Sequence, residues 1–305
     1  MTLTPYELPF REPVHTATGV FTSRRGWILT LANSGRVGRG DAAPWPGFGD
    51  GRCPAEALRA LDPQRLLGLR PADVPSLDLP PEAAHAVQQA LMELAGESPG
   101  LVRQPTVGVH SLVTGAPDPT RRTLKIKVGG DLAADDARVA AVRAASDARL
   151  RLDANGAWTT EQALRATERL ARHGIEWIEQ PTPTLEGLAA VRRLGVAVAA
   201  DESVATLADL EAVIAAGAAD AVVVKPMFAG GPLEGARIAH RALEAGLRVV
   251  VTCALESAVG RLGALRLAAT LPGDEDHGLE APLSQDLAPF PVAQAGRLAV
   301  PEGPC

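Results

Sequence analysis

The chain has 305 residues, 46% hydrophobic and 22% charged, which is enough to bury one large core beside a smaller one. Its formal net charge of −6 comes without any block rich in Lys or Arg, which argues against a nucleic acid or an anionic membrane as partner. We therefore expect a small-molecule substrate, and the sequence leaves the oligomeric state open, a monomer included.

Cysteine use and the first residues favour a cytoplasmic protein. Cys53, Cys253 and Cys305 are odd in number and scattered, which indicates neither a disulfide framework nor a CxxC metal site. Residues 1–8 lack a basic flank and an apolar run long enough for a signal peptide, and no later run approaches a membrane span.

Residues 1–104 predict a small α+β domain. Alternating runs at 26–32 and 35–41, separated by turn residues, are typical of antiparallel strands. The prolines and glycines of 43–50 indicate a loop that carries aromatic side chains. Apolar residues at helical intervals from Pro81 then predict a helix that stops at Gly96.

Residues 105–288 have the texture of repeated βα units, in which short apolar runs alternate with helical patterns rich in Ala, Leu and Arg. They predict an α/β fold of the TIM type, a (β/α)7β barrel that lacks the last helix. Residues 289–305 are expected to return to the first domain. The expected strands are 107–112, 123–127, 150–153, 177–179, 196–201, 221–225, 247–252 and 278–280.

Three carboxylates end three successive predicted strands: Asp153, Glu179 and Asp201. Each has a structural alternative. Asp153 could belong to a strand-to-helix turn, and Glu202 beside Asp201 could cap a helix. The spacings of 26 and 22 residues each match one barrel unit, however, and the carboxyl ends of barrel strands share one mouth. A buried acid in such a place must be paired, protonated or bound to a metal.

Lysines bracket the three carboxylates. Strand alternation places Lys125 and Lys127 on one face, which could simply be solvated, and Lys225 could snorkel to water or pair with an acid. Lys127 precedes Asp153 by 26 residues and Lys225 follows Asp201 by 24, again one barrel unit each. The inner face of a barrel is not solvated, so we expect these amines in the same mouth as the carboxylates.

This combination suits the removal of a proton next to a carboxylate. The product is a dianion, which a divalent cation on the carboxylate oxygens would stabilise. Oxygen ligands without His or Cys favour Mg²⁺, or Mn²⁺ as a substitute, over zinc. A lysine acts as a base near neutral pH only when its pKa is lowered by about three units. The metal and the ammonium of Lys125 would both shift Lys127 in that direction.

The pattern formed by these residues resembles that of the enolase superfamily. The shared features are a small capping domain, Lys125 and Lys127 on the second barrel strand, carboxylates that end the third to fifth strands, and Lys225 at the end of the sixth. Within the superfamily the chain is similar to the muconate-lactonising subgroup, and most similar to its o-succinylbenzoate synthase family. That closer similarity rests on 151–158, the loop at 43–48 and the segment 253–260.

The resemblance implies that Asp153, Glu179 and Asp201 bind Mg²⁺. It implies that Lys127 removes the proton alpha to the substrate carboxylate and returns it to the departing hydroxyl, a syn dehydration of 2-succinyl-6-hydroxy-2,4-cyclohexadiene-1-carboxylate in menaquinone biosynthesis. Lys225 would hold its ammonium against the developing anion. The alternatives are an N-acylamino acid racemase or dipeptide epimerase, because two opposed lysines can exchange one alpha proton, and a catalytically silent barrel.

The resemblance also assigns supporting residues. Lys125 would tune Lys127, loop residues around 18–19 and 45–48 would close over the site, and His110 and His277 are expected to be structural. The remaining supporting and substrate-binding candidates, each of which could instead be structural, are Arg151, Asn155, Glu202 and Ser257.

Overall fold

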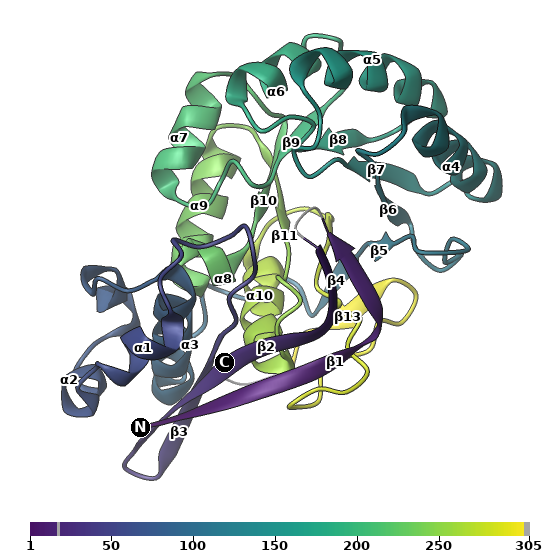
Figure 1. Cartoon of the computed structure of the whole chain (residues 1–305). Helices are drawn as coiled ribbons and strands as arrows, with labels where there is room; N and C mark the ends of the chain where they lie inside the picture. Colours follow the sequence, from purple (N-terminus) through teal and green to yellow (C-terminus); the bar gives the residue numbers. More distant parts are fainter. Residues whose placement is uncertain (17–18, 302–305) are drawn as a thin grey trace.

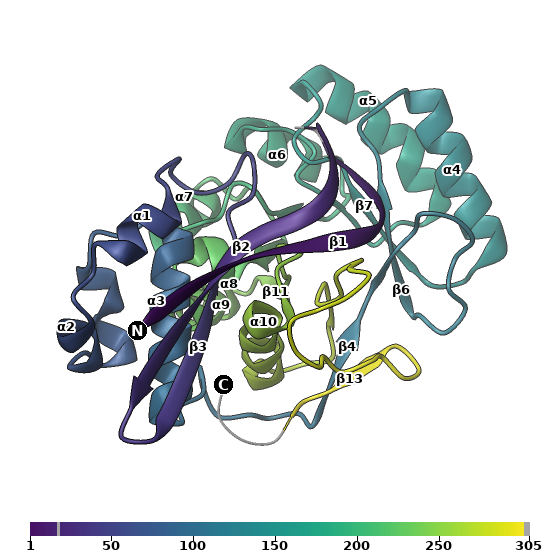
Figure 2. The same cartoon turned by 60° about the horizontal axis from the view of Figure 1, so that its bottom comes forward.

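The chain begins with a three-stranded antiparallel sheet, which confirms the antiparallel strands predicted for the first domain. The computed structural model describes residues 1–16 and 19–301. In this sheet β2 (Gly19–Asn33) pairs with both β1 (Thr2–Thr16) and β3 (Arg36–Ala42). The hairpin of β1 and β2 is long enough to reach from the first domain to the barrel, as both views show (Figures 1 and 2).

Helices cover one face of this sheet. The predicted helix is present as α3 (Pro81–Ala95) and ends at Gly96, whose positive φ of 74° suits glycine. Two glycines of β3 let the helix approach the strand: a Cβ at Gly40 would lie 1.9 Å from the carbonyl oxygen of Ala86. Smaller helices complete the domain, namely α1 (Pro54–Arg59), α2 (Pro63–Leu67) and the 3-10 helix η1 (Pro71–Ser76).

The second domain is the expected barrel. Seven strands form one sheet in the order β11-β10-β9-β8-β7-β6-β5, and an isolated bridge from Thr252 to Gly278 leads from β11 to β12. β12 pairs with β4, which runs directly into β5, so the ring closes. The strands are β4 (Thr106–Val109), β5 (Ser111–Leu112), β6 (Thr123–Lys127), β7 (Arg149–Asp153), β8 (Trp177–Glu179), β9 (Val198–Ala200), β10 (Ala221–Val224), β11 (Arg248–Val251) and β12 (Asp276–His277).

Helices wrap the outside of the barrel, as Figure 1 shows in teal, green and yellow-green. The predicted order of units needs one correction: within the described residues, the first strand is followed by the irregular loop 113–122 and not by a helix. The predicted strand 107–112 is also interrupted at His110, where pairing changes from β12 to β6. The helices are α4 (Leu132–Ala145), α5 (Thr160–Leu170), η2 (Ala171–His173), α6 (Leu185–Arg192), α7 (Leu207–Ala215), α8 (Pro226–Ala229), α9 (Pro232–Glu244) and α10 (Ala258–Thr270).

The C-terminal segment differs from its predicted course. Residues 289–305 were expected on the first domain, but β13 (Arg297–Ala299) pairs antiparallel with β4 of the barrel. The contact with the first domain comes earlier, where Phe10 of β1 bridges Leu283 and the backbone N–H of Ser284 donates to Pro9. Leu298 is fully buried against the barrel core, which explains why β13 lies there. Residues 302–305 lie outside the described residues. Among the described residues, no helix has the length and apolar character needed to cross a membrane.

The close packing of α3 on β3 gives a stability prediction. Gly40→Ala places a methyl group against the backbone of Ala86, so strand and helix must separate, and we expect a loss of about 1–3 kcal/mol or more in the free energy of unfolding. Urea denaturation of the full chain measures this. Gly115→Ala is the control, because no atom lies within 4 Å of its added Cβ. Equal unfolding free energies for the two variants would contradict the close contact.

Candidate active site

The structure brings the predicted carboxylates and lysines together at one mouth of the barrel. Neighbouring parallel strands align Lys127 with Asp153 and Asp153 with Glu179. Asp201 follows the end of β9 directly, and Lys225 lies between the end of β10 and the start of α8. Each side chain therefore comes from the carboxyl end of a different strand, as the spacing predicted.

The carboxylates are almost fully buried and each contacts a lysine. Asp153, Glu179 and Asp201 are 1%, 2% and 5% exposed. The Nζ atom of Lys125 lies 2.8 Å from Asp153 Oδ2 and 2.7 Å from Glu179 Oε1. Lys127 Nζ lies 2.6 Å from the same Asp153 oxygen, and Lys225 pairs with Asp201. The lysines thus supply the positive charge that this cluster requires.

The ionisation of the cluster reflects both burial and charge. Burial would lower the pKa of Lys125, but Asp153, Glu179 and Asp201 outweigh it and raise that pKa well above its usual value. Lys225 follows the same pattern, with Asp201 the main opposing charge. Burial and then the charge of Asp153 raise the pKa of Glu179 to about 8. Glu179 is therefore the carboxylate of the cluster whose ionised form is least well stabilised.

These lysines are the only ones in the sequence: the chain contains Lys125, Lys127 and Lys225, and its other 27 basic residues are all arginines. Arginine keeps its charge in every setting, whereas the compact ammonium of lysine can give up a proton. The sequence analysis missed this signal. All three lysines of the chain thus lie at the mouth of the barrel.

Two predicted supporting residues join the cluster. Asn155 accepts a hydrogen bond from Lys127 Nζ, and its Nδ2 donates to Glu202 Oε1 at 3.0 Å. Its backbone N–H donates to Asp153 Oδ1 at 3.0 Å. Asn155 has a φ of 46°, a left-handed conformation that asparagine tolerates better than most residues. Asn155 thus connects Lys127 to Asp153 and Glu202.

Gln180 is a site residue that the sequence analysis overlooked. It is buried, and its Oε1 accepts the backbone N–H of Asp201 at 2.9 Å and that of Ser203 at 3.3 Å. Its Nε2 donates to Ser203 Oγ at 2.6 Å. The signal in the sequence was a buried amide directly after a strand and before Pro181. Gln180 fixes the backbone that carries Asp201.

Arg151 is not brought to the carboxylates. Its guanidinium lies 4.0 Å from the ring centroid of Trp177 and pairs with Glu176 at 2.6 Å and Glu275 at 2.9 Å. These partners precede β8 and β12, so the side chain fills the barrel interior towards the end opposite the mouth. Its observed contacts are those of a core ion pair.

Ser257 lies at the junction of the two domains. It is fully buried, and its Oγ donates to Asp41 Oδ2 at 2.6 Å while its N–H donates to the same oxygen at 3.1 Å. Tyr6 also donates to Asp41, at 2.9 Å. The expected substrate contact is therefore replaced by a contact with the first domain, because the carboxylate of Asp41 needs these donors.

The aromatic loop 43–50 lies against the mouth, as its predicted role as a cover requires. Phe48 stacks on Phe228 of α8, with ring centroids 4.6 Å apart, and Lys225 Nζ lies 4.7 Å from the Phe48 centroid. Trp45 packs on Phe21, and the guanidinium of Arg24 lies 4.9 Å from the centroid of the Trp45 ring. Of the other two expected loop residues, Thr18 lies outside the described residues and Gly19 begins β2.

The two histidines differ. His277 Nδ1 accepts the backbone N–H of Val251 at 3.0 Å, and burial lowers the pKa of His277 to about 4, so it is neutral and structural as expected. His110 was also expected to be structural: its ring forms a hydrogen bond with the backbone of Asp276, while its Nδ1 has no partner among the described residues. Burial, followed by the charge of Lys125, lowers the pKa of His110 well below its usual value.

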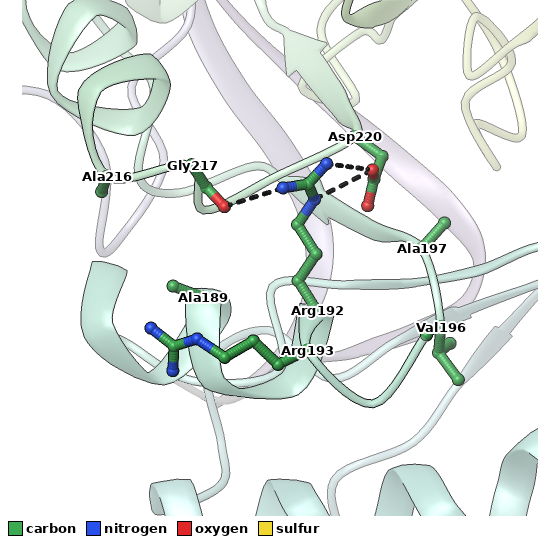
Figure 3. Close-up of a pocket in the computed structure, with 9 residues that line it drawn as sticks. Ala189, Arg192, Arg193, Val196, Ala197, Ala216, Gly217 and Asp220 are labelled. Atoms are coloured by element: carbon green, nitrogen blue, oxygen red, sulfur yellow. Dashed lines mark hydrogen bonds and ion pairs between the residues drawn. The ribbon is translucent and has the colours of Figure 1, made fainter.

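A separate hollow lies at the other end of the barrel. Its lining includes Arg192, Gly217 and Asp220 (Figure 3). Arg192 points to Asp220 and donates to it at 2.9 Å, and it donates to the Gly217 carbonyl at 3.2 Å. These residues precede β9 and β10, whereas Asp201 and Lys225 follow the same strands. This hollow is therefore distinct from the carboxylate site.

The carboxylate site has the donors that a hard divalent cation prefers. Among the described residues, no three acidic, thiol or imidazole side chains surround a common point in the form seen here, because Lys125 lies between Asp153 and Glu179 and Lys225 binds Asp201. All three carboxylates nevertheless lie at the ends of adjacent strands, β7, β8 and β9. The donor set fits Mg²⁺ better than zinc, since it contains only oxygen.

Comparison with known proteins identifies the family. Residues 118–304 match the model of the Enolase C-terminal domain-like family, which is more than half of the chain. An α/β barrel with acidic and lysine side chains at its mouth is thus the fold and site of an enolase-superfamily enzyme. The chain belongs to this superfamily and, within it, to the muconate-lactonising subgroup.

Individual relatives have different activities. The o-succinylbenzoate synthase of Mycobacterium ulcerans is 38% identical over 208 residues, which are 63% of this chain but only 62% of that protein. The hydrophobic dipeptide epimerase of Enterococcus faecalis is 30% identical over 93% of this chain and 90% of its own. A solved Enterococcus faecalis dipeptide epimerase, complexed with Mg and L-Leu-L-Tyr, has a TM-score of 0.89 at 27% identity and covers 99% of this chain and 97% of its own.

The domain junction gives a pH prediction. Burial raises the pKa of Glu256 to about 7, with the charge of Asp41 adding to the effect and Arg24 opposing it. The folded protein then keeps a proton that the unfolded chain releases above a pH of about 4.5. This contribution to stability is full below that pH and is lost as the pH rises to about 7.

Glu256→Gln should remove this pH-dependent loss of folding stability. Between pH 5 and 8 the unfolding free energy of the wild type should fall by about 2–3 kcal/mol more than that of the variant. Urea denaturation across this pH range tests the difference, with the exposed Glu97→Gln as control. Parallel pH profiles for wild type and Glu256→Gln would show that burial does not hold this proton.

Proposed function

We propose that this enzyme removes a proton from the carbon next to a substrate carboxylate, with Lys127 as the base and Lys225 on the opposite side. The strand order carries the proposal. Lys127 ends β6 and Lys225 follows β10, while the three carboxylates follow the strands between them. A substrate in the mouth would therefore lie between two amines.

Asp153, Glu179 and Asp201 would hold one Mg²⁺, with Mn²⁺ as a substitute. When bound, the divalent cation would offset the negative charge that builds on the substrate carboxylate as the proton leaves. The magnesium complex of the Enterococcus faecalis epimerase supports this cofactor. The raised pKa of Glu179 also supports it, because an added cation would favour the ionised form.

The three lysines would have different roles. The side chain of Lys127 is 46% exposed, whereas that of Lys225 is 15% exposed, so Lys127 is the more accessible to a substrate. Lys127 would take the alpha proton while Asn155 orients its Nζ. Lys225 would remain protonated and stabilise the developing anion from the other face. Lys125, held by two carboxylates, would influence Lys127 by its charge.

Two reactions use this arrangement. In the synthase reaction, which we favour, the proton removed by Lys127 would leave with the hydroxyl group as water, and the product would be 2-succinylbenzoate, an intermediate of menaquinone biosynthesis. The 38% identical synthase supports this substrate. In the alternative, a racemase or epimerase of N-acylamino acids or dipeptides, Lys225 would exchange the proton on the opposite face. The opposed lysines and the dipeptide epimerase relatives favour that candidate.

Proton exchange with solvent separates the two reactions. The enzyme is incubated with Mg²⁺ and N-succinyl amino acids in heavy water, and deuterium at the alpha carbon is followed by NMR. A dedicated synthase should leave these compounds unlabelled while it dehydrates the cyclohexadiene carboxylate. Rapid alpha labelling without dehydration would instead establish the racemase or epimerase reaction.

The assignment of the base is tested by Lys127→Ala. Loss of the group that carries the proton should lower magnesium-dependent turnover by about 10²–10⁴-fold. Gly115→Ala, in the loop 113–122, serves as the control: it is prepared in the same way, and its turnover should match that of the wild type because no atom lies within 4 Å of the added Cβ. Turnover of Lys127→Ala within a few-fold of the wild type would contradict the proposed role.

A further inference from the structure

Phe48 places an aromatic ring of the first domain beside a lysine of the barrel. The ring is half-buried in the loop between β3 and α1, and its centroid lies 4.7 Å from Lys225 Nζ. At this distance an ammonium is attracted by the electron-rich face of an aromatic ring. Within the described residues, the other close partner of this ammonium is the carboxylate of Asp201.

The position of the ring is itself fixed from the barrel. Phe48 stacks on Phe228 with an interplanar angle of 13° and a centroid distance of 4.6 Å. Phe228 belongs to α8, the short helix that begins directly after Lys225, and its backbone N–H donates to the carbonyl of Lys225 at 3.0 Å. The ring that faces the ammonium is thus aligned by the same turn of chain that carries the lysine.

This arrangement limits the movement of Lys225. A free lysine side chain samples many rotamers, and holding it in one of them costs conformational entropy. The carboxylate of Asp201 restrains one side of the ammonium, while Phe48 restrains another and shields it from water. Ala43, Met227 and Ala254 pack around the two rings, so the restraint belongs to a buried apolar cluster.

We propose that Phe48 is a positioning residue for Lys225, so that the first domain completes the site by fixing this ammonium at the mouth of the barrel. The inference deepens the proposed function and rests on it for the role of Lys225. Phe48 itself need not touch the reacting atoms.

The small number of lysines allows a direct test of this placement. Full-length protein labelled with ¹³C at lysine Cε gives three side-chain methylene signals, one for each of Lys125, Lys127 and Lys225. Lys225→Arg identifies the Lys225 signal by its loss. Because this methylene group lies near the face of Phe48, its protons should be shifted upfield in the wild type. Phe48→Leu should abolish the shift, whereas Phe48→Tyr should keep it.

Kinetics with Mg²⁺ and the synthase and racemase substrates give the second readout. An interaction that holds a group acting on the developing anion should affect kcat more than KM. We expect Phe48→Leu to lower kcat about 3- to 30-fold, and Phe48→Tyr or Phe48→Trp to retain most of it. Phe290→Leu is the matched control, because it removes a ring that lies 3.9 Å from the guanidinium of Arg261 instead of Lys225.

The outcomes are distinct. An unshifted Lys225 signal in the wild type, or a shift that persists in Phe48→Leu, overturns the proposal. So does an equal loss of kcat in Phe48→Leu and Phe48→Tyr, since the ring would then serve packing alone. If the shift is present and depends on the ring but neither substrate class reacts, the placement of Lys225 stands and the proposed function fails.

Discussion

Burial of three carboxylates at the barrel mouth is the constraint on which the rest of the site depends. Removing each charge from water costs several kcal/mol unless a cation compensates it. The chain meets this requirement with its only three lysines, two of which pair with Asp153. Glu179 still retains a raised pKa, with burial as its main cause. Glu179 is therefore the carboxylate whose ionised form a further cation would favour most.

The two domains contribute differently to this cluster. The parallel strands of the barrel position the charged groups, because the carboxyl ends of adjacent strands meet at one mouth. This position does not depend on the helices outside the barrel. At the opposite end, Arg151 and Arg248 flank Trp177 and pair with Glu176 and with Glu275. The first domain adds the aromatic loop, and its Asp41 ties β3 to the start of α10 through Ser257. The proposed function therefore depends on the domain interface as well as on the barrel.

The barrel was predictable because the spacing of one βα unit survives in the sequence, and the same spacing predicted that Lys127, Asp153, Glu179, Asp201 and Lys225 meet at one mouth. The remaining features depend on contacts that spacing does not encode. Alternation along a strand puts Arg151 inside the barrel but does not say which end its guanidinium reaches. Ser257 meets Asp41, 216 residues away in sequence, and no local pattern records that contact. The irregular loop 113–122 also followed a strand where a regular repeat predicted a helix, since a charge-rich turn already connects the strands there.

We infer that Asp153, Glu179 and Asp201 together form one site for a divalent cation beside the lysines. Crystals of the full chain soaked in Mn²⁺ test it most directly, because the anomalous signal locates the ion independently of the surrounding coordinates. We expect a single strong peak with oxygens of all three carboxylates as ligands. A mouth without such a peak, with Lys125 and Lys225 still bound to the carboxylates in crystals that hold Mn²⁺ elsewhere, would contradict it.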